Sequence, residues 1–153
     1  MPFQAHFMIQ RVQTLYLLFA TGMSALMLYL PVYELMPVLQ DPSSSTTVTQ
    51  FSIMSSSLLL ILNGGIGVLS FLCIFLFKKR NIQIRLCNLL MLITCVLIGL
   101  LFFSADTMST SMNQRVHYLF GTYLPLMQLL FIFLAMRYVK RDENLIRSAS
   151  RLR

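Results

Sequence analysis

The segment Lys78-Lys79-Arg80-Asn81-Ile82-Gln83-Ile84-Arg85 decides how this chain folds, because it is a short basic turn between two long apolar runs. The run before it, residues 56–77, contains no Lys, Arg, Asp or Glu, and neither does the run after it, residues 86–103. A helix rises about 1.5 Å per residue, so about 20 apolar residues cross the hydrocarbon core of a bilayer. The two runs therefore predict two transmembrane helices joined by a tight, positively charged loop.

Two further apolar runs, residues 12–32 and 116–139, flank this hairpin. Arg137 is the one Lys, Arg, Asp or Glu residue in the four runs. It lies near enough to the end of its run for its side chain to reach the headgroups. With 57% apolar and 11% charged residues and a mean hydropathy of +0.74, the 153-residue chain is far from the composition of a soluble domain. We expect an all-α membrane protein, a single domain over residues 1–153 that forms a bundle of four transmembrane helices.

The distribution of basic residues predicts the orientation of this bundle. Eleven of the twelve Lys and Arg residues fall at run ends that share one side of the membrane, and only Arg115 falls on the other. Cytoplasmic loops of membrane proteins carry an excess of Lys and Arg, so we expect loop 78–85 and both termini in the cytoplasm. Residues 33–55 and 104–115 then form outer loops.

The tail, residues 140–153, follows the fourth run and adds to the net charge of +7. Leu145, Ala149 and Leu152 recur at helical spacing, which predicts a short amphipathic basic segment that either continues the fourth helix or lies on the inner leaflet. Because the positive charge lies beside membrane spans, with no interleaved aromatic residues, we expect the anionic headgroups of the lipid bilayer as its partner and not nucleic acid.

Polar and small residues at membrane depth are the candidates for a functional site, because each needs a partner inside the hydrocarbon. Asn63, Gly64 and Gly67 lie in the second run, and Pro125 and Gln128 lie in the fourth. They fit helix packing within the chain, the lining of a solute path, or a dimer face. Pro125 also predicts a kink, because proline in a helix frees the carbonyl four residues before it.

The residues that could act as nucleophiles or metal ligands do not form a recognisable motif in this sequence. Cys73, Cys87 and Cys95 lack C-x-x-C spacing, so we interpret them as small packing residues. His6 and His117 fall on opposite sides of the predicted membrane. We therefore expect no catalytic residue, no metal site and no cofactor, and a protein that is not an enzyme.

Three strings of the chain, taken together, carry a resemblance to a known family. They are Met8-Ile9-Gln10-Arg11-Val12-Gln13-Thr14-Leu15-Tyr16-Leu17-Leu18, Ile82-Gln83-Ile84-Arg85-Leu86-Cys87, and the tail from Leu145 to Arg153. They resemble a Bacteroidota membrane family of unknown function, numbered 4293, from Met8 onward. This resemblance implies a four-helix protein of a bacterial inner membrane and transfers no activity. Ser150 departs from the acidic residue that the family pattern leads us to expect.

The polar parts of these strings all fall on the predicted cytoplasmic side, so we expect the working surface there. The candidate interface residues are Arg11, Gln13, Gln83, Arg85, Arg147 and Arg151. The favoured hypothesis is a non-enzymatic accessory or scaffold subunit of a membrane assembly, with a membrane-protein partner or a second copy of itself. The alternative is a small oligomeric transporter or channel for a neutral solute, because four helices rarely enclose a pore alone.

Overall fold

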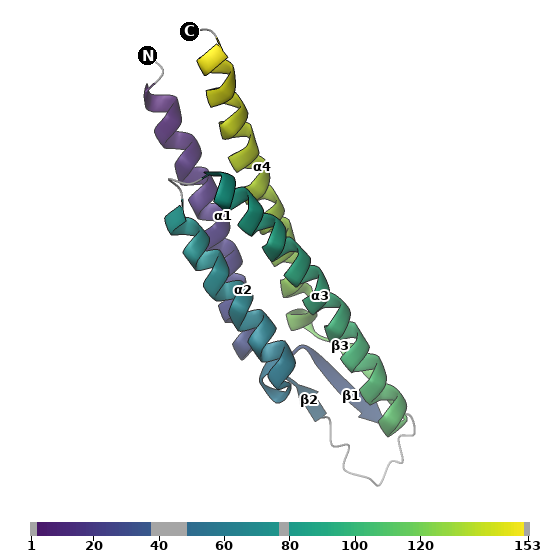
Figure 1. Ribbon diagram of the computed structural model, residues 1–153. Coiled ribbons are helices and arrows are strands. Elements are labelled where there is room, and N and C mark those ends of the chain that lie inside the picture. The colour runs from purple at the N-terminus through teal and green to yellow at the C-terminus, as the bar shows by residue number, and fades with distance from the viewer. Residues whose placement is uncertain (1–2, 38–48, 77–79, 152–153) are drawn as a thin grey trace.

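The computed structural model describes the backbone of residues 3–37, 49–76 and 80–151, and the side chains of residues 12–37, 49–76 and 81–141. Four long helices form an elongated bundle, namely α1 (Phe3–Tyr29), α2 (Ser57–Phe75), α3 (Arg80–Met112) and α4 (Leu124–Arg151) (Figure 1). The chain has four helical stretches long and apolar enough to cross a membrane. The prediction of four helices able to cross a membrane is confirmed in length and composition.

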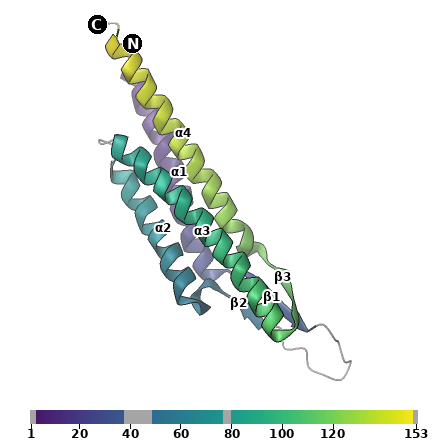
Figure 2. The same ribbon diagram turned by 45° about the vertical axis from the view of Figure 1, so that its right-hand side comes forward.

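The helices are arranged in a ring in chain order. α1 packs on α2 and α4, and α3 packs on the same two helices. Both termini lie at the end of the bundle where α2 ends and α3 begins, and there α1 and α4 project beyond α2 and α3 (Figures 1 and 2). We call this end the basic end, because Arg85, Lys140 and Arg141 lie there. We call the opposite end, where three short strands lie, the sheet end.

A small sheet, which the sequence did not lead us to expect, closes the sheet end. Its strands are β1 (Tyr33–Pro37), β2 (Thr49–Phe51) and β3 (Gln114–Tyr118), antiparallel in the order β2-β1-β3. Strand β1 alternates buried and more exposed residues from Tyr33 to Met36, as expected for a sheet with one face against a core. The segments expected to be outer loops are therefore partly a folded cap.

The third helix is longer than its apolar run, since α3 continues to Met112 instead of ending at residue 103. Hydroxyl groups in this extension bond to carbonyls of the preceding turn, with Ser104 Oγ donating to Leu101 over 2.8 Å and Thr107 Oγ1 to Phe103 over 2.8 Å. These bonds satisfy polar side chains within a helix. Asn113, with a φ of 50°, adopts the left-handed conformation that ends many helices.

The fourth run does not begin as a helix, which corrects the expected span of residues 116–139. Its first residues belong to β3, then a 3-10 turn covers Phe120–Tyr123, and α4 starts at Leu124. Pro125 is thus in the first turn of α4, where its missing N–H would have no helical partner in any case. The expected kink in mid-helix is wrong. The basic tail continues α4 to Arg151.

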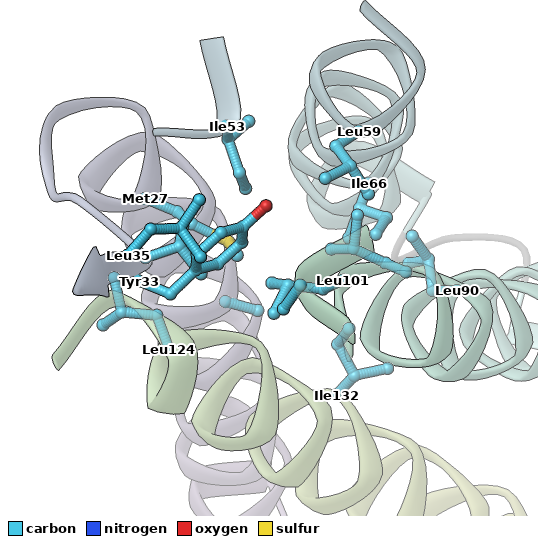
Figure 3. Close-up of a cluster of buried hydrophobic side chains, with 14 residues drawn as sticks. Met27, Tyr33, Leu35, Ile53, Leu59, Ile66, Leu90, Leu101, Leu124 and Ile132 are labelled. Atoms are coloured by element: carbon cyan, nitrogen blue, oxygen red, sulfur yellow. The ribbon is translucent and has the colours of Figure 1, made fainter. Parts of the chain in front are cut away.

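The buried side chains of all four helices recur at alternating intervals of three and four residues. The residues that follow this spacing are Gln13, Leu17, Ala20, Ser24 and Met27 in α1; Leu59, Asn63, Ile66, Ser70 and Cys73 in α2; Gln83, Cys87, Leu90, Thr94 and Leu97 in α3; and Pro125, Gln128, Ile132, Ala135 and Val139 in α4. Leu101 and Ala105 of α3 and Leu124 and Met136 of α4 are buried in addition. This heptad spacing is typical of helices that cross at small angles, with side chains interlocking along a seam. The apolar members form two clusters. The larger one extends into the sheet end around Tyr33 (Figure 3), and the smaller one contains Leu17, Cys73, Cys87 and Ala135.

Candidate functional site

The bundle core contains a series of buried polar residues, which is where a membrane protein carries function by default. They are Gln13, Ser24, Asn63, Ser70, Gln83, Thr94 and Gln128, and all lie at heptad core positions. Their side chains point at neighbouring helices and not at lipid. What this site can do therefore depends on which of these groups already have partners inside the chain.

Ser24 of α1 and Asn63 of α2 form a reciprocal pair. The Ser24 hydroxyl donates to the Asn63 backbone carbonyl over 2.9 Å and lies 3.2 Å from Oδ1, while Asn63 Nδ2 donates to the Ser24 carbonyl over 3.0 Å. Both side chains are buried. Hydrogen bonds of this kind join helices where no water is present to compete. Asn63 thus uses both polar atoms of its side chain within the chain.

The two candidate glycines of α2 lie in different surroundings. A Cβ added to Gly67 would lie 2.7 Å from Ser24 Oγ, so α1 approaches α2 closely at this point. A Cβ added to Gly64 would meet nothing within 4 Å, and Gly64 is exposed on the outside of the bundle. The structure brings Asn63 and Gly67 together at Ser24 and leaves Gly64 facing outward.

Gln128 of α4 also bonds across the bundle, with Nε2 donating to the Ala20 carbonyl of α1 over 3.3 Å. Its Oε1 is buried without a hydrogen-bond partner in the described part of the chain, and so is Ser70 Oγ of α2. Pro125 is buried one turn before Gln128. With the Tyr33 hydroxyl at the sheet end, these two oxygens are buried groups of the described core that a water molecule or polar solute could still satisfy.

Near the basic end, the core contains two cysteines that the sequence spacing did not pair. Cys73 Sγ of α2 lies 3.8 Å from Cys87 Sγ of α3, and both side chains are buried. Gln83 Nε2 donates to the Cys73 carbonyl over 3.2 Å. The Gln83 side chain is 1% exposed, and its hydrogen bond joins α3 to α2. This burial corrects the expected place of Gln83 on an accessible interface.

The other expected interface residues have different positions. Arg85 is exposed on α3, whereas Gln13 is buried in α1. Arg11, Arg147 and Arg151 lie on the projecting ends of α1 and α4, with side chains outside the described residues.

The sheet end carries a polar row that sequence reasoning missed. Glu34 of β1 stands between Gln50 of β2 and His117 of β3 in the register, and Gln50 Nε2 donates to the Glu34 carboxylate over 2.8 Å.

On the opposite face of β1, burial raises the pKa of the Tyr33 phenol above its ordinary value. Alternation is limited to Tyr33-Glu34-Leu35 and Val116-His117-Tyr118, three residues each, which is shorter than the four to eight residues that predict a strand. Within the described side chains, no three His, Cys, Asp or Glu residues are grouped to hold a metal ion.

Four membrane-length helices that bond their polar core groups to one another, with a small sheet at one end, define a multi-pass helical membrane protein. Within that class, the model of the family described as Domain of unknown function (DUF4293) matches residues 9–152, so the chain belongs to this family, as the resemblance predicted. No curated protein and no solved structure matches the chain. Membership assigns the extent of the domain and no activity.

Proposed function

We propose that this protein is a non-enzymatic accessory or scaffold subunit of a bacterial inner-membrane assembly, and that its basic end is the docking end. The observation that carries the proposal is the projection of two adjacent helices at this end. The apolar windows are Val12–Tyr29 and Phe120–Arg141, yet α1 begins at Phe3 and α4 continues to Arg151. Helices that continue past the apolar window, without α2 or α3 beside them, offer a surface to another protein (Figure 1).

The composition of the projecting ends supports the same surface. Arg11 lies on the projecting part of α1, and Arg147 and Arg151 on that of α4. Positive residues close to membrane spans favour the cytoplasmic side, which puts the sheet end in the periplasm. The backbone at these three positions is helical, so a partner would meet residues of two helices and not of a loose tail.

Crosslinking in cells tests the docking end directly. A photoreactive residue replacing Arg147 should give one or a few discrete protein adducts, because this position lies on the projecting part of α4. The matched control replaces Ile61, which is 71% exposed in the second turn of α2 and should give no discrete adduct. A protein that yields no adduct at position 147, and that purifies as a partner-free monomer from several mild detergents, would refute the proposal.

A second candidate, an oligomeric transporter or channel for a neutral solute, has support from Ser70 Oγ and Gln128 Oε1. These buried oxygens lack partners among the described residues and could bind a passing polar molecule. Against it, Asn63 is bonded to Ser24 and Gly64 faces outward, so the candidate path residues do not converge. Reconstitution into liposomes is the test, and an absence of flux for every solute tried, together with normal growth of an Asn63→Leu strain, would remove this candidate.

A further inference from the structure

The outer face of α4 at the basic end carries a pocket that neither the family nor the proposed docking role explains. Leu134, Arg137, Tyr138 and Arg141 line it. Arg137 and Arg141 are one helical turn apart, so their guanidinium groups project from the same face. Both are exposed, while Leu134 and Tyr138 are half-buried, so charge surrounds a partly apolar floor.

An aromatic wall continues from this pocket toward the middle of the bundle, along the seam between α1 and α4. The Tyr138 ring stacks on Tyr16 with centroids 5.4 Å apart, Tyr16 lies 6.3 Å from Phe131, and Phe131 stacks on Phe19 at 5.5 Å. Phe19 is exposed on the outside of the bundle. The seam therefore presents a continuous ring surface to the hydrocarbon, with two cations at its basic end.

No carboxylate among the described side chains offsets these cations. The acids whose side chains are described are Glu34 and Asp106, and both lie toward the sheet end, in β1 and in the last turns of α3. Arg137 and Arg141 fall in the last turns of the apolar window Phe120–Arg141, the depth at which headgroups meet hydrocarbon. Arginine suits phosphate particularly well, because its planar donors can bond two oxygens at once.

We propose that this pocket is a binding site for one anionic glycerophospholipid. The phosphate lies between Arg137 and Arg141, and an acyl chain lies along the aromatic wall from Tyr16 to Phe19. A zwitterionic lipid offers the same phosphate, but the two arginines would repel its ammonium group, so we expect the pocket to prefer the anionic lipid. The site is separate from the projecting helix ends, so it can exist whether or not a protein docks there.

Native mass spectrometry of the full-length protein in detergent tests the site. Delipidated protein is titrated with dioleoyl phosphatidylglycerol, with dioleoyl phosphatidylcholine, and with inorganic phosphate. We expect phosphatidylglycerol to bind at least about tenfold more tightly than phosphatidylcholine, and the Arg137→Gln/Arg141→Gln variant to lose about 30-fold in affinity for it, which corresponds to about 1 kcal/mol per arginine. The control Lys140→Gln removes one charge from the same helix outside the pocket and should keep most of the affinity.

Three outcomes overturn the proposal. They are equal binding of the two lipids, an equal loss in the Lys140→Gln control and the double variant, and inorganic phosphate binding as tightly as the anionic lipid, which would make the pocket a site for free phosphate. Because both arginines are exposed, the double variant should keep the melting temperature of the parent protein. The conservative Arg137→Lys/Arg141→Lys variant should retain the preference for anionic lipid at reduced affinity, so misfolding and loss of the site remain distinguishable.

Discussion

Replacing Gly67 by alanine should destabilise the bundle, because the new methyl group has no room at the crossing of α1 and α2. The added Cβ would lie 2.7 Å from Ser24 Oγ and 3.3 Å from Ser24 Cβ. Overpacking of this kind costs about 1–3 kcal/mol. Alanine also gains up to about 1 kcal/mol over glycine as a helix former, so the net loss in free energy of unfolding should be about 0–2 kcal/mol.

A matched control isolates the steric part of this change. Gly64 lies one turn earlier on α2, and a Cβ there meets nothing within 4 Å. Gly64→Ala gains the same helix propensity without overpacking, so it should leave the protein as stable as the parent or more so. The propensity contribution cancels in the difference between the two variants. That difference should therefore equal the overpacking cost, about 1–3 kcal/mol.

The assay is reversible unfolding in mixed micelles of dodecyl maltoside and sodium dodecyl sulfate, followed by circular dichroism. Repeating both substitutions in a Ser24→Ala background removes the hydroxyl oxygen at 2.7 Å and leaves only the 3.3 Å contact, so the difference between them should fall below about 1 kcal/mol. Equal stabilities of Gly67→Ala and Gly64→Ala, or a difference that Ser24→Ala does not reduce, would refute the packing of α1 against α2 described above.

Three other changes test separate parts of the fold. Copper phenanthroline should link Cys73 to Cys87, whose sulfurs lie 3.8 Å apart, and should leave Cys95 open to alkylation in a mass-spectrometric assay; an unlinked pair would contradict the packing of α2 on α3. Gly121→Ala should lower the free energy of unfolding by about 3 kcal/mol, since its Cβ would clash with the backbone between α1 and β1, and unchanged hydrogen exchange in the sheet would argue against this contact. Gln128→Leu should stay within about 1 kcal/mol of the parent in the same micelle assay, because it loses one long hydrogen bond and also removes a partnerless buried oxygen; a loss above about 3 kcal/mol would be inconsistent with this environment.

The four helices could be predicted from the sequence because each apolar run satisfies its own backbone, which is the dominant requirement in a bilayer. The sheet could not be predicted in this way, because the pairing of β1 with β3 joins Tyr33 to Tyr118. These residues are far apart in the chain, and their register depends on the finished bundle. The helical extension of α3 was missed for a local reason. Serine and threonine that suggest a loop in water can bond back to their own helix, as Thr107 does.

The candidate site was predictable in composition and not in detail. Hydropathy alone placed Asn63, Gly64 and Gly67 at membrane depth, but it could not say that Gly67 contacts α1 while Gly64 faces outward. Neighbouring positions on one helix differ in which helix they meet, and that information resides in the heptad pattern shared by all four helices. The burial of Gln83 follows from the same pattern, since it occupies a core position in α3.

Accessibility of single cysteines to a membrane-impermeant maleimide in intact spheroplasts is the most direct test of a four-pass protein with its basic end in the cytoplasm. The native cysteines are a suitable background, because Cys73 and Cys87 are buried and Cys95 lies within the third apolar window. Gln50→Cys, exposed in β2, should be labelled without permeabilisation, and Arg147→Cys should be labelled only after it. Labelling of Arg147→Cys in intact spheroplasts, with Gln50→Cys protected, would contradict the topology and the docking role inferred from it.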